Sequence, residues 1–327
     1  MAATSPLLRL PTLLDGLMEV EEELDASVRT DDELLSEIAS HLITAGGKRG
    51  RPALCLASAA IGHVGEPVRH DEVMGGVAVE LVHLGSLYHD DVMDDATMRR
   101  TVESVNARWG NLKAILAGDF LLAKASEIAA SLGTEVAGLL AATIGRLCEG
   151  QVRELQHTYD VDRTEEQYLT SIEGKTAALF ATACRIGALV GELPREHVNA
   201  LTEFGRLYGM AFQVVDDVLD VVATDEQLGK PAGHDLVEGV YTLPVIRTLA
   251  GPGSDELRDL LGRPLDDAEK DKARKIVRSN GAVEEAVDVA RRFTRDAAAA
   301  LAPLGENEMA AVLAATADDL LTSIPRP

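Results

Sequence analysis

The 327-residue sequence contains few aromatic residues, only 3 % of the total. That scarcity, together with abundant Ala and Leu, disfavours a sheet and favours helices. No run of about 18 uncharged apolar residues is present, so we expect no membrane-spanning helix. The N-terminal stretch lacks a basic start and a long apolar core, so we expect no signal peptide. These absences predict a soluble, cytoplasmic protein.

Basic residues are also in short supply: 31 Lys and Arg stand against 54 Asp and Glu, which gives a net charge of −23. Such a chain is a poor partner for nucleic acid or an anionic membrane surface. An anionic substrate would require metal ions or a local group of Lys and Arg. The three cysteines, Cys55, Cys148 and Cys184, lie far apart without metal-ligand spacing. We expect buried free thiols, as in a reducing cytosol.

Helical periodicity runs through nearly the whole chain and is interrupted by Gly and Pro. The segments 111–133 and 134–159 are apolar almost all round, which predicts central, buried helices. The segment 224–244 has the composition of a loop. We therefore predict an all-α fold, with a single domain over 1–327 and a motif-bearing core over about 40–250. The other helices are expected at 13–28, 31–43, 52–62, 71–95, 164–192 and 195–223.

Two segments carry three aspartates each in the pattern D-D-x-x-D, "HDDVMDD" at 89–95 and "QVVDDVLDV" at 213–221. On a helix, the first and last Asp of the pattern share a face. A hard divalent cation relieves their repulsion, and carboxylate oxygens are the ligands that Mg²⁺ accepts. The pattern therefore predicts magnesium ligands at Asp90, Asp91, Asp94, Asp216, Asp217 and Asp220.

The alternative for any Asp pair is a solvated acidic face, and the chain contains its own comparison. The pairs at 31–32, 266–267 and 318–319 lack the third Asp. Apolar residues surround the second cluster, and unpaired charges on such a core helix would be very costly. These apolar neighbours are Val214, Val215, Val218 and Leu219.

Basic residues stand close to both clusters along the chain. Metal-bound phosphates attract Lys and Arg, and "GGKRGRP" places Lys48, Arg49 and Arg51 on a Gly-rich loop. Arg99 and Arg100 follow the first cluster by five and six residues. Each of these residues alone would be an ordinary surface residue. Their order along the chain and their closeness to the Asp clusters favour a phosphate-binding role. The remaining candidates are Lys175 and Thr176 in "GKTA", Lys230 in "GKP" and Gln213.

In this order the motifs resemble those of the trans-isoprenyl diphosphate synthases, the family that makes polyprenyl diphosphates. The matching stretches are "GGKRGRP", "DDVMDDATMRR", "GKTA", "QVVDDVLD" and "GKPAGHDLVEGVYTLP", over about residues 40 to 250. The resemblance implies a helical bundle of the isoprenoid synthase type with both Asp motifs across a central cavity, and usually a homodimer. It also implies head-to-tail condensation of isopentenyl diphosphate with an allylic diphosphate, with several Mg²⁺ ions per active site.

The resemblance assigns roles by motif position. Isopentenyl diphosphate would contact Lys48, Arg51, His83 and Arg100. The allylic diphosphate would be held, through or beside Mg²⁺, by Arg99, Lys175, Thr176, Gln213 and Lys230. The residues expected to serve catalysis directly are Asp90, Asp91, Asp94, Arg99, Lys175, Asp216, Asp217 and Lys230.

Two positions depart from the family pattern. Thr101 stands where the family often has Gly after R-R, and Val240 stands where it often has Lys before T-L-P. The second departure removes one possible phosphate contact. Neither departure removes a metal ligand.

Product length is expected to depend on Gly85 and Ser86, which lie about one helical turn before Asp90. In the family, bulky residues at these positions mark short products. Small residues here, with no large block at Val82, predict a product longer than C20. Small residues can also serve helix packing alone, so a C15 or C20 synthase is the alternative.

Three other proteins would share parts of this pattern. A di-iron carboxylate bundle would use the Glu-x-x-His pairs at 80–83 and 154–157, but it leaves the Asp clusters unexplained. A class I terpene cyclase shares the first Asp motif, but its second motif is expected to carry Ser or Thr where this chain has Asp220. A non-catalytic subunit of a heteromeric synthase would have lost motif aspartates, and none is lost.

Overall fold

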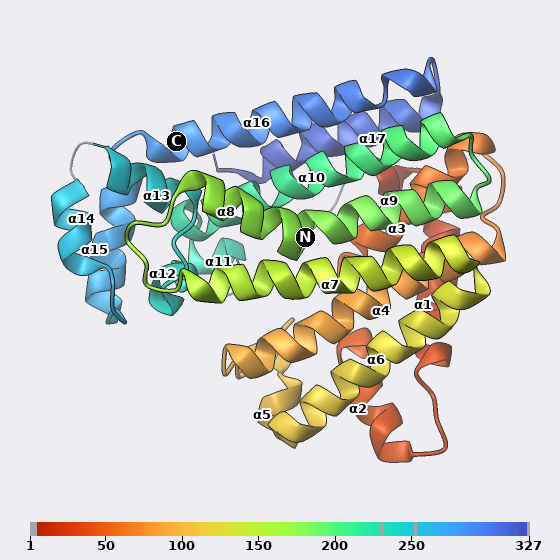
Figure 1. The fold of residues 1–327 in the computed structure, drawn as a ribbon, viewed down its shortest axis with the longest axis horizontal. Coiled ribbons are helices and arrows are strands. Elements are labelled where there is room, and N and C mark those ends of the chain that lie inside the picture. Colours follow the sequence, from red (N-terminus) through yellow and green to blue (C-terminus); the bar gives the residue numbers. More distant parts are fainter. Residues whose placement is uncertain (1–4, 229–231, 252–253, 326–327) are drawn as a thin grey trace. The chain divides into compact units, whose positions relative to one another are not determined.

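The computed structural model describes residues 5–228, 232–251 and 254–325, and most of these residues are helical (Figure 1). The prediction of an all-α fold is confirmed. Start signals explain many of the helices. Pro11 opens the first long helix, and the Asp32 side chain accepts the Leu35 N–H at 3.0 Å to cap the second. Thr164 and Gln167 form a reciprocal capping box further along the chain.

The chain divides into two compact units, and each is described by itself. The first contains residues 1–144, 179–205 and 300–313, and the second contains 145–178, 206–299 and 314–327. The prediction of one domain over 1–327 stays a prediction. Helices α7 (Thr134–Gln156), α10 (Arg195–Val222) and α17 (Glu308–Asp319) contribute residues to both units.

In the first unit, α4 (His70–Met93) is the most buried long helix and packs along α6, α3 and α1. Glycine permits this closeness at one position: a Cβ at Gly85 would lie 3.0 Å from the Gly118 carbonyl oxygen of α6. The other helices of the unit are α1 (Pro11–Ser27), α2 (Glu33–Thr44), α3 (Gly50–Ala59), α5 (Val105–Trp109), α6 (Asn111–Ser131) and α9 (Ala178–Val190).

A short antiparallel hairpin follows α4, formed by β1 (Met98–Arg99) and β2 (Val102–Glu103). Its two central residues, Arg100 and Thr101, have φ values of 50° and 67°. Positive φ at both positions is the geometry of a tight two-residue hairpin turn, which glycine or asparagine adopts with least strain. The hairpin is the one sheet among the described residues, and it was not predicted from the sequence.

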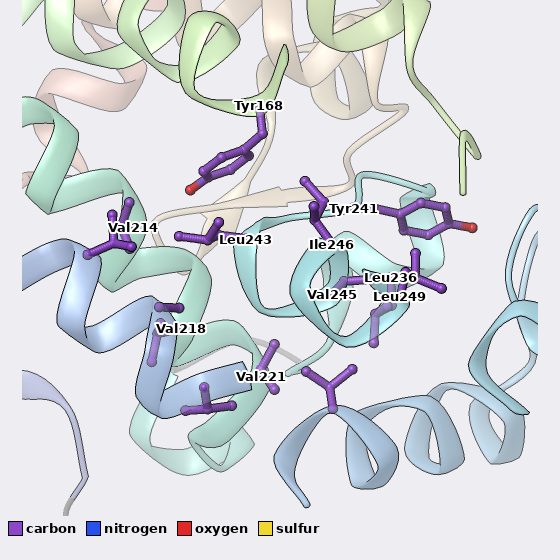
Figure 2. Packing of buried hydrophobic residues seen from close by; sticks show 14 of the residues in the cluster. Tyr168, Val214, Val218, Val221, Leu236, Tyr241, Leu243, Val245, Ile246 and Leu249 are labelled. Carbon is purple, nitrogen blue, oxygen red and sulfur yellow. The ribbon is translucent and has the colours of Figure 1, made fainter. Parts of the chain in front are cut away.

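In the second unit, the valines of α10 point into an apolar core (Figure 2). Val214, Val215 and Val218 are buried, as the apolar pattern predicted, whereas Leu219 is only partly buried. Tyr168 closes one edge of this core, and residues of α13 form much of the rest. The helices are α8 (Glu165–Ile172), α11 (Asp225–Leu228), α12 (His234–Glu238), α13 (Leu243–Ala250), α14 (Ser254–Leu260), α15 (Asp267–Arg278) and α16 (Ala282–Ala300).

Several expectations were wrong in detail. The segment 224–244 contains the two short helices α11 and α12, and a π-helical turn, η3 (Glu173–Ala177), interrupts the helix expected over 164–192. Helices α6 and α7 are not buried all round, since Leu112, Leu116 and Val152 are exposed. Cys148 is exposed, whereas the other two cysteines are buried, and all three are free. No described helix has the length and apolarity to cross a membrane.

Candidate active site

The first Asp cluster lies at the C-terminal end of α4, where the helix gives way to the hairpin. Asp94 is the C-cap residue and is exposed, and its backbone N–H donates to the Asp90 carbonyl at 2.9 Å. Asp90 is half-buried and lies one helical turn earlier, so the two side chains share a face of α4. This pair is placed as the sequence predicted.

Asp91 differs from its neighbours because it is fully buried. Its Oδ1 accepts a hydrogen bond from Arg99 Nε at 2.7 Å and forms an ion pair with Arg99 Nη2 at 2.6 Å. Its Oδ2 is buried with no hydrogen-bond partner. Burial raises the pKa of the Asp91 carboxyl, and the Arg99 guanidinium opposes that rise. Asp91 therefore anchors the first arginine of the hairpin, and its second oxygen has no hydrogen-bond partner in the protein.

The loop at 45–49 carries the basic motif directly into the N-terminus of α3. The helix begins at Gly50, so the proline of the motif is its third residue rather than its first. Lys48 is exposed, and the Arg51 guanidinium stacks over the Phe180 ring at 4.4 Å. Helix N-termini and cationic side chains both favour anions, so this end of α3 suits a phosphate group.

His83 lies on α4 and is half-buried. Its pKa is well below the ordinary histidine value because burial, and then the charges of Arg51 and Arg100, disfavour the imidazolium. Arg49 and Arg99 act in the same direction. Four arginines thus lower the pKa of this histidine, and three of them, Arg51, Arg99 and Arg100, were predicted to bind diphosphate.

The second Asp cluster lies on α10, and its three side chains have different surroundings. Asp216 is exposed, whereas Asp217 is buried. Asp217 accepts hydrogen bonds from the Tyr168 hydroxyl at 2.5 Å and the Gln213 amide at 2.8 Å, and Thr176 donates to Gln213 at 2.7 Å. Burial raises the pKa of Asp217 to about 7, against the lowering effect of these two hydrogen bonds.

Asp220 is also buried, and both of its carboxylate oxygens face the start of α12. They accept the backbone N–H groups of His234 and Asp235 at 3.3 Å each. The Asp220 carbonyl accepts the Gly233 N–H at 2.9 Å. Asp220 therefore closes the loop after α10, a role that its motif position did not predict. Lys230, expected in this loop, lies outside the described residues.

Lys175 and Thr176 lie in the π-helical turn η3, a feature often found at functional sites. Two glycines bring this turn against α7: a Cβ at Gly150 would lie 2.3 Å from the Lys175 nitrogen. Lys175 is ion-paired with Glu154 of α7. Since Glu154 is paired with Lys175, and Glu80 with Arg49 at 2.9 Å, both glutamates of the di-iron alternative already have basic partners.

Magnesium suits the donors that each unit offers. Within the described residues, no three His, Cys, Asp or Glu side chains form a ready metal cage. Mg²⁺ does not need one, because it is usually held by one or two carboxylates, several waters and substrate phosphates. The partnerless Asp91 oxygen and the accessible Asp90, Asp94 and Asp216 fit that mode.

Several supporting residues escaped the sequence analysis, namely Glu21, Glu80, Glu154 and Tyr168, each of which contacts a motif residue or its neighbour. Glu80 could have been found, because it is a lone charge inside the apolar stretch "GGVAVELVHL". A charge in such a place must have a partner. Glu154 was noted only as part of a Glu-x-x-His pair, and no local signal singled out Glu21 or Tyr168.

Comparison with known proteins identifies the family. The chain matches the polyprenyl synthetase family over residues 32–278. The chain belongs to this family. The predicted resemblance is thereby confirmed, and the protein is a prenyltransferase of the polyprenyl diphosphate synthase type.

Individual members of the polyprenyl synthetase family resemble this chain along most of the chain's length. It is 40 % identical over 306 residues to a nonaprenyl diphosphate synthase of Mycobacterium tuberculosis, covering 93 % of this chain and 91 % of that protein. It is 42 % identical over 249 residues to a geranylgeranyl diphosphate synthase of Methanosarcina mazei, covering 72 % and 76 %. The nonaprenyl relative agrees with the expectation of a long product.

A solved structure of the family agrees with the fold. The polyprenyl synthase of Caulobacter crescentus, complexed with calcium and isoprenyl diphosphate, superposes with a TM-score of 0.90. It is 32 % identical, and the match covers 97 % of each chain. That relative therefore holds a divalent cation and a prenyl diphosphate on the same fold.

Proposed function

We propose that this synthase condenses isopentenyl diphosphate head-to-tail with an allylic diphosphate, in the presence of Mg²⁺, and releases a polyprenyl diphosphate longer than C20. The observation that carries the proposal is the junction of α4 and the hairpin. There a pair of carboxylates on one helical face, Asp90 and Asp94, is followed by an arginine that a buried Asp91 holds in place. Carboxylates and arginines so arranged suit a metal-bound diphosphate.

Magnesium would be held chiefly by Asp90, Asp94 and Asp216, which are the more accessible aspartates of the two motifs. When bound, it stabilises negative charge on the departing diphosphate. Asp91, Asp217 and Asp220 complete the proposed sites. Their hydrogen bonds suit them to support Arg99, Gln213 and the start of α12.

The two diphosphates would occupy different basic groups. Isopentenyl diphosphate would meet Lys48, Arg51, His83 and Arg100, and the allylic diphosphate would meet Arg99, Lys175, Thr176, Gln213 and Lys230. A neutral His83 keeps one ring N–H to donate and one nitrogen to accept, which suits orientation of a phosphate oxygen.

The reaction would break the allylic C–O bond, and the diphosphate would leave with the electron pair. The isopentenyl double bond would attack the allylic carbon, and the proton then lost would pass to the released diphosphate. Apolar Ala and Leu walls would exclude water, which would otherwise react with the allylic carbocation. The side chains of Arg99 and Lys175 would bind and orient the leaving group.

Product length would depend on Ser86 more than on Gly85. Gly85 has a packing reason to be small, because an added Cβ would meet the α6 backbone and Leu122. Ser86 is half-buried, and its hydroxyl donates to the His83 carbonyl at 2.8 Å. A bulky residue at Ser86, one turn before Asp90, would shorten the space for the growing chain.

We also propose a homodimer formed through α6. Leu112 is 80 % exposed and Leu116 is 64 % exposed, and both lie on one face of α6 with Ile115. Leucines so exposed are unusual on a monomer and typical of an interface. A second copy of the same chain is the occupant that fits a self-complementary apolar face.

The test is incubation of the purified protein with isopentenyl diphosphate, Mg²⁺ and C10, C15 or C20 allylic primers, followed by sizing of the products. We expect chains longer than C20, and no product after addition of a chelator. Asp90→Ala should lower turnover by at least about a hundredfold while helical content is retained. Ser86→Phe should shift the product to shorter chains. Absence of condensation with every primer would refute the proposal.

A further inference from the structure

Glu80 is a carboxylate buried in the middle of α4, three residues before His83 and only 2 % exposed. Its Oε1 accepts a hydrogen bond from Arg49 Nη1 at 2.9 Å and lies 3.8 Å from Arg100 Nη2. A buried charge without a partner would be strongly destabilising. One carboxylate oxygen therefore serves two arginines from segments about fifty residues apart in the sequence.

Arg49 faces the interior although it lies in an otherwise exposed basic motif. Arg49 is 5 % exposed. Its backbone has φ of 46°, a conformation that is strained for any residue other than glycine. Besides Glu80, it donates to both oxygens of Glu21 at 2.6 and 2.9 Å and to the Ile43 carbonyl at 3.2 Å. These bonds hold the loop in a shape that leaves Lys48 exposed.

Arg100 reaches the same loop from the hairpin. Its Nη1 donates to the carbonyls of Leu42, at 3.2 Å, and Gly46. Burial and the nearby charges of Arg49 and Arg99 lower its pKa, and the Glu80 carboxylate opposes this effect. The two guanidiniums lie close together, since a Cβ on Gly47 would come within about 3.0 Å of both. A negative charge between them reduces their repulsion.

We propose that Glu80 is a positioning residue for the isopentenyl diphosphate site. It joins the basic loop to the hairpin through Arg49 and Arg100, so that Lys48, Arg51 and Arg100 face one ligand together. This inference rests on the proposed function, which assigns that diphosphate to these residues.

The charge of Glu80 and its positioning role predict opposite changes in diphosphate binding when Glu80 is neutralised. A carboxylate near a diphosphate repels it, so loss of the charge alone would strengthen binding. Loss of the positioned arginines would weaken it. In Glu80→Gln we expect the KM for isopentenyl diphosphate to rise roughly tenfold. The KM for the allylic diphosphate should stay within about twofold of the wild type. An isopentenyl KM that is unchanged or lower would overturn the inference.

A second variant keeps the test decisive if Glu80→Gln folds poorly, because removal of one member of a buried ion pair is strongly destabilising. Glu21 is 44 % exposed at its side chain and shares Arg49 with Glu80. Glu21→Gln should raise the isopentenyl KM about threefold with the allylic KM unchanged. Wild-type values in a folded Glu21→Gln enzyme would count against the inference whenever Glu80→Gln cannot be measured.

The matched control is Glu37→Gln. Glu37 pairs with Arg108 at 3.2 Å in an exposed ion pair of the same unit, and both KM values should stay as in the wild type. Thermal unfolding of all variants separates loss of fold from loss of positioning. A wild-type enzyme that does not use isopentenyl diphosphate would refute the proposed function. Wild-type KM values in an active, folded Glu80→Gln would refute this inference alone.

Discussion

Carboxylates paired with basic side chains are the common feature of the residues that support the two motifs. Asp91 holds Arg99, Glu80 holds Arg49 and Arg100, and Glu154 holds Lys175. Each carboxylate fixes a cation that would otherwise be a flexible surface side chain with considerable rotamer entropy. A preorganised cation loses less entropy when it binds a phosphate.

The first prediction concerns His83, which burial and neighbouring arginines keep neutral in the folded protein. Its folded pKa is lower than its unfolded value of about 6.5, so the unfolded chain takes up a proton first as the pH falls. His83 therefore does not lower the free energy of unfolding above about pH 6.5. Below that pH it lowers the free energy of unfolding progressively. In His83→Asn this part of the pH dependence should disappear.

Urea unfolding between about pH 5 and 8 measures this effect, since the free energy of unfolding of the wild type should fall relative to His83→Asn only at the acidic end. Curves that remain parallel would show that the histidine protonates equally in both states. Other titrating groups are common to both proteins and cancel in the difference.

At the residue scale, the motif aspartates and arginines were easier to predict from the sequence than the residues that hold them in place. The aspartates and arginines of the motifs were predicted because their spacing is local, and α4 and α10 carry the aspartates as expected. Their partners were missed because contacts such as Tyr168 to Asp217 join positions 49 residues apart. Local spacing also treated Asp94 and Asp220 alike, although Asp94 is exposed and Asp220 is buried.

At the scale of elements, most helices begin and end within a few residues of the predicted bounds, because capping residues and glycines mark them. The hairpin after α4 was missed because its strands have two residues each and no glycine marks its turn. The π-helical turn was missed because it adds one residue to a continuous apolar pattern.

The second prediction concerns Thr101, the position where the family often has glycine. Thr101 is β-branched and has φ of 67°, a strained combination that costs on the order of 1–3 kcal/mol. Glycine would remove that strain at an entropic cost of roughly 0.5–1 kcal/mol. Thr101→Gly should therefore raise the free energy of unfolding by about 1 kcal/mol, measured by denaturant titration.

Thr97→Gly is the matched control for this substitution. It lies in the same hairpin segment without a positive φ, and its carbonyl accepts the Ser104 N–H at 3.0 Å. Glycine there brings the entropic cost with no relief of strain, so stability should fall. A Thr101→Gly protein no more stable than the wild type would mean that the turn accommodates threonine without strain.

At the scale of the whole molecule, the net charge of −23 opposes both anionic substrates and self-association. In the proposed function, the basic loop, the hairpin arginines and divalent ions would offset that field locally for a diphosphate. For two copies of the chain, an apolar contact must outweigh the long-range repulsion. Helix α6 offers such a contact, although its apolar pattern predicts a buried helix.

The last prediction follows from this balance between an apolar face and a repelling charge. If two copies meet through α6, lysines at Leu112 and Leu116 would place four like charges across a two-fold interface, so Leu112→Lys/Leu116→Lys should be monomeric by analytical ultracentrifugation. Met18→Lys, at an apolar residue of α1 that is 63 % exposed, should leave the mass unchanged. Because the repulsion of net charge is screened over about 10 Å at 0.1 M salt, dimerisation of the wild type should strengthen from 10 mM to 200 mM salt. A double-lysine variant that keeps the dimer mass would place the interface elsewhere, and a dimer weakened by salt would show that ion pairs rather than the leucines hold it.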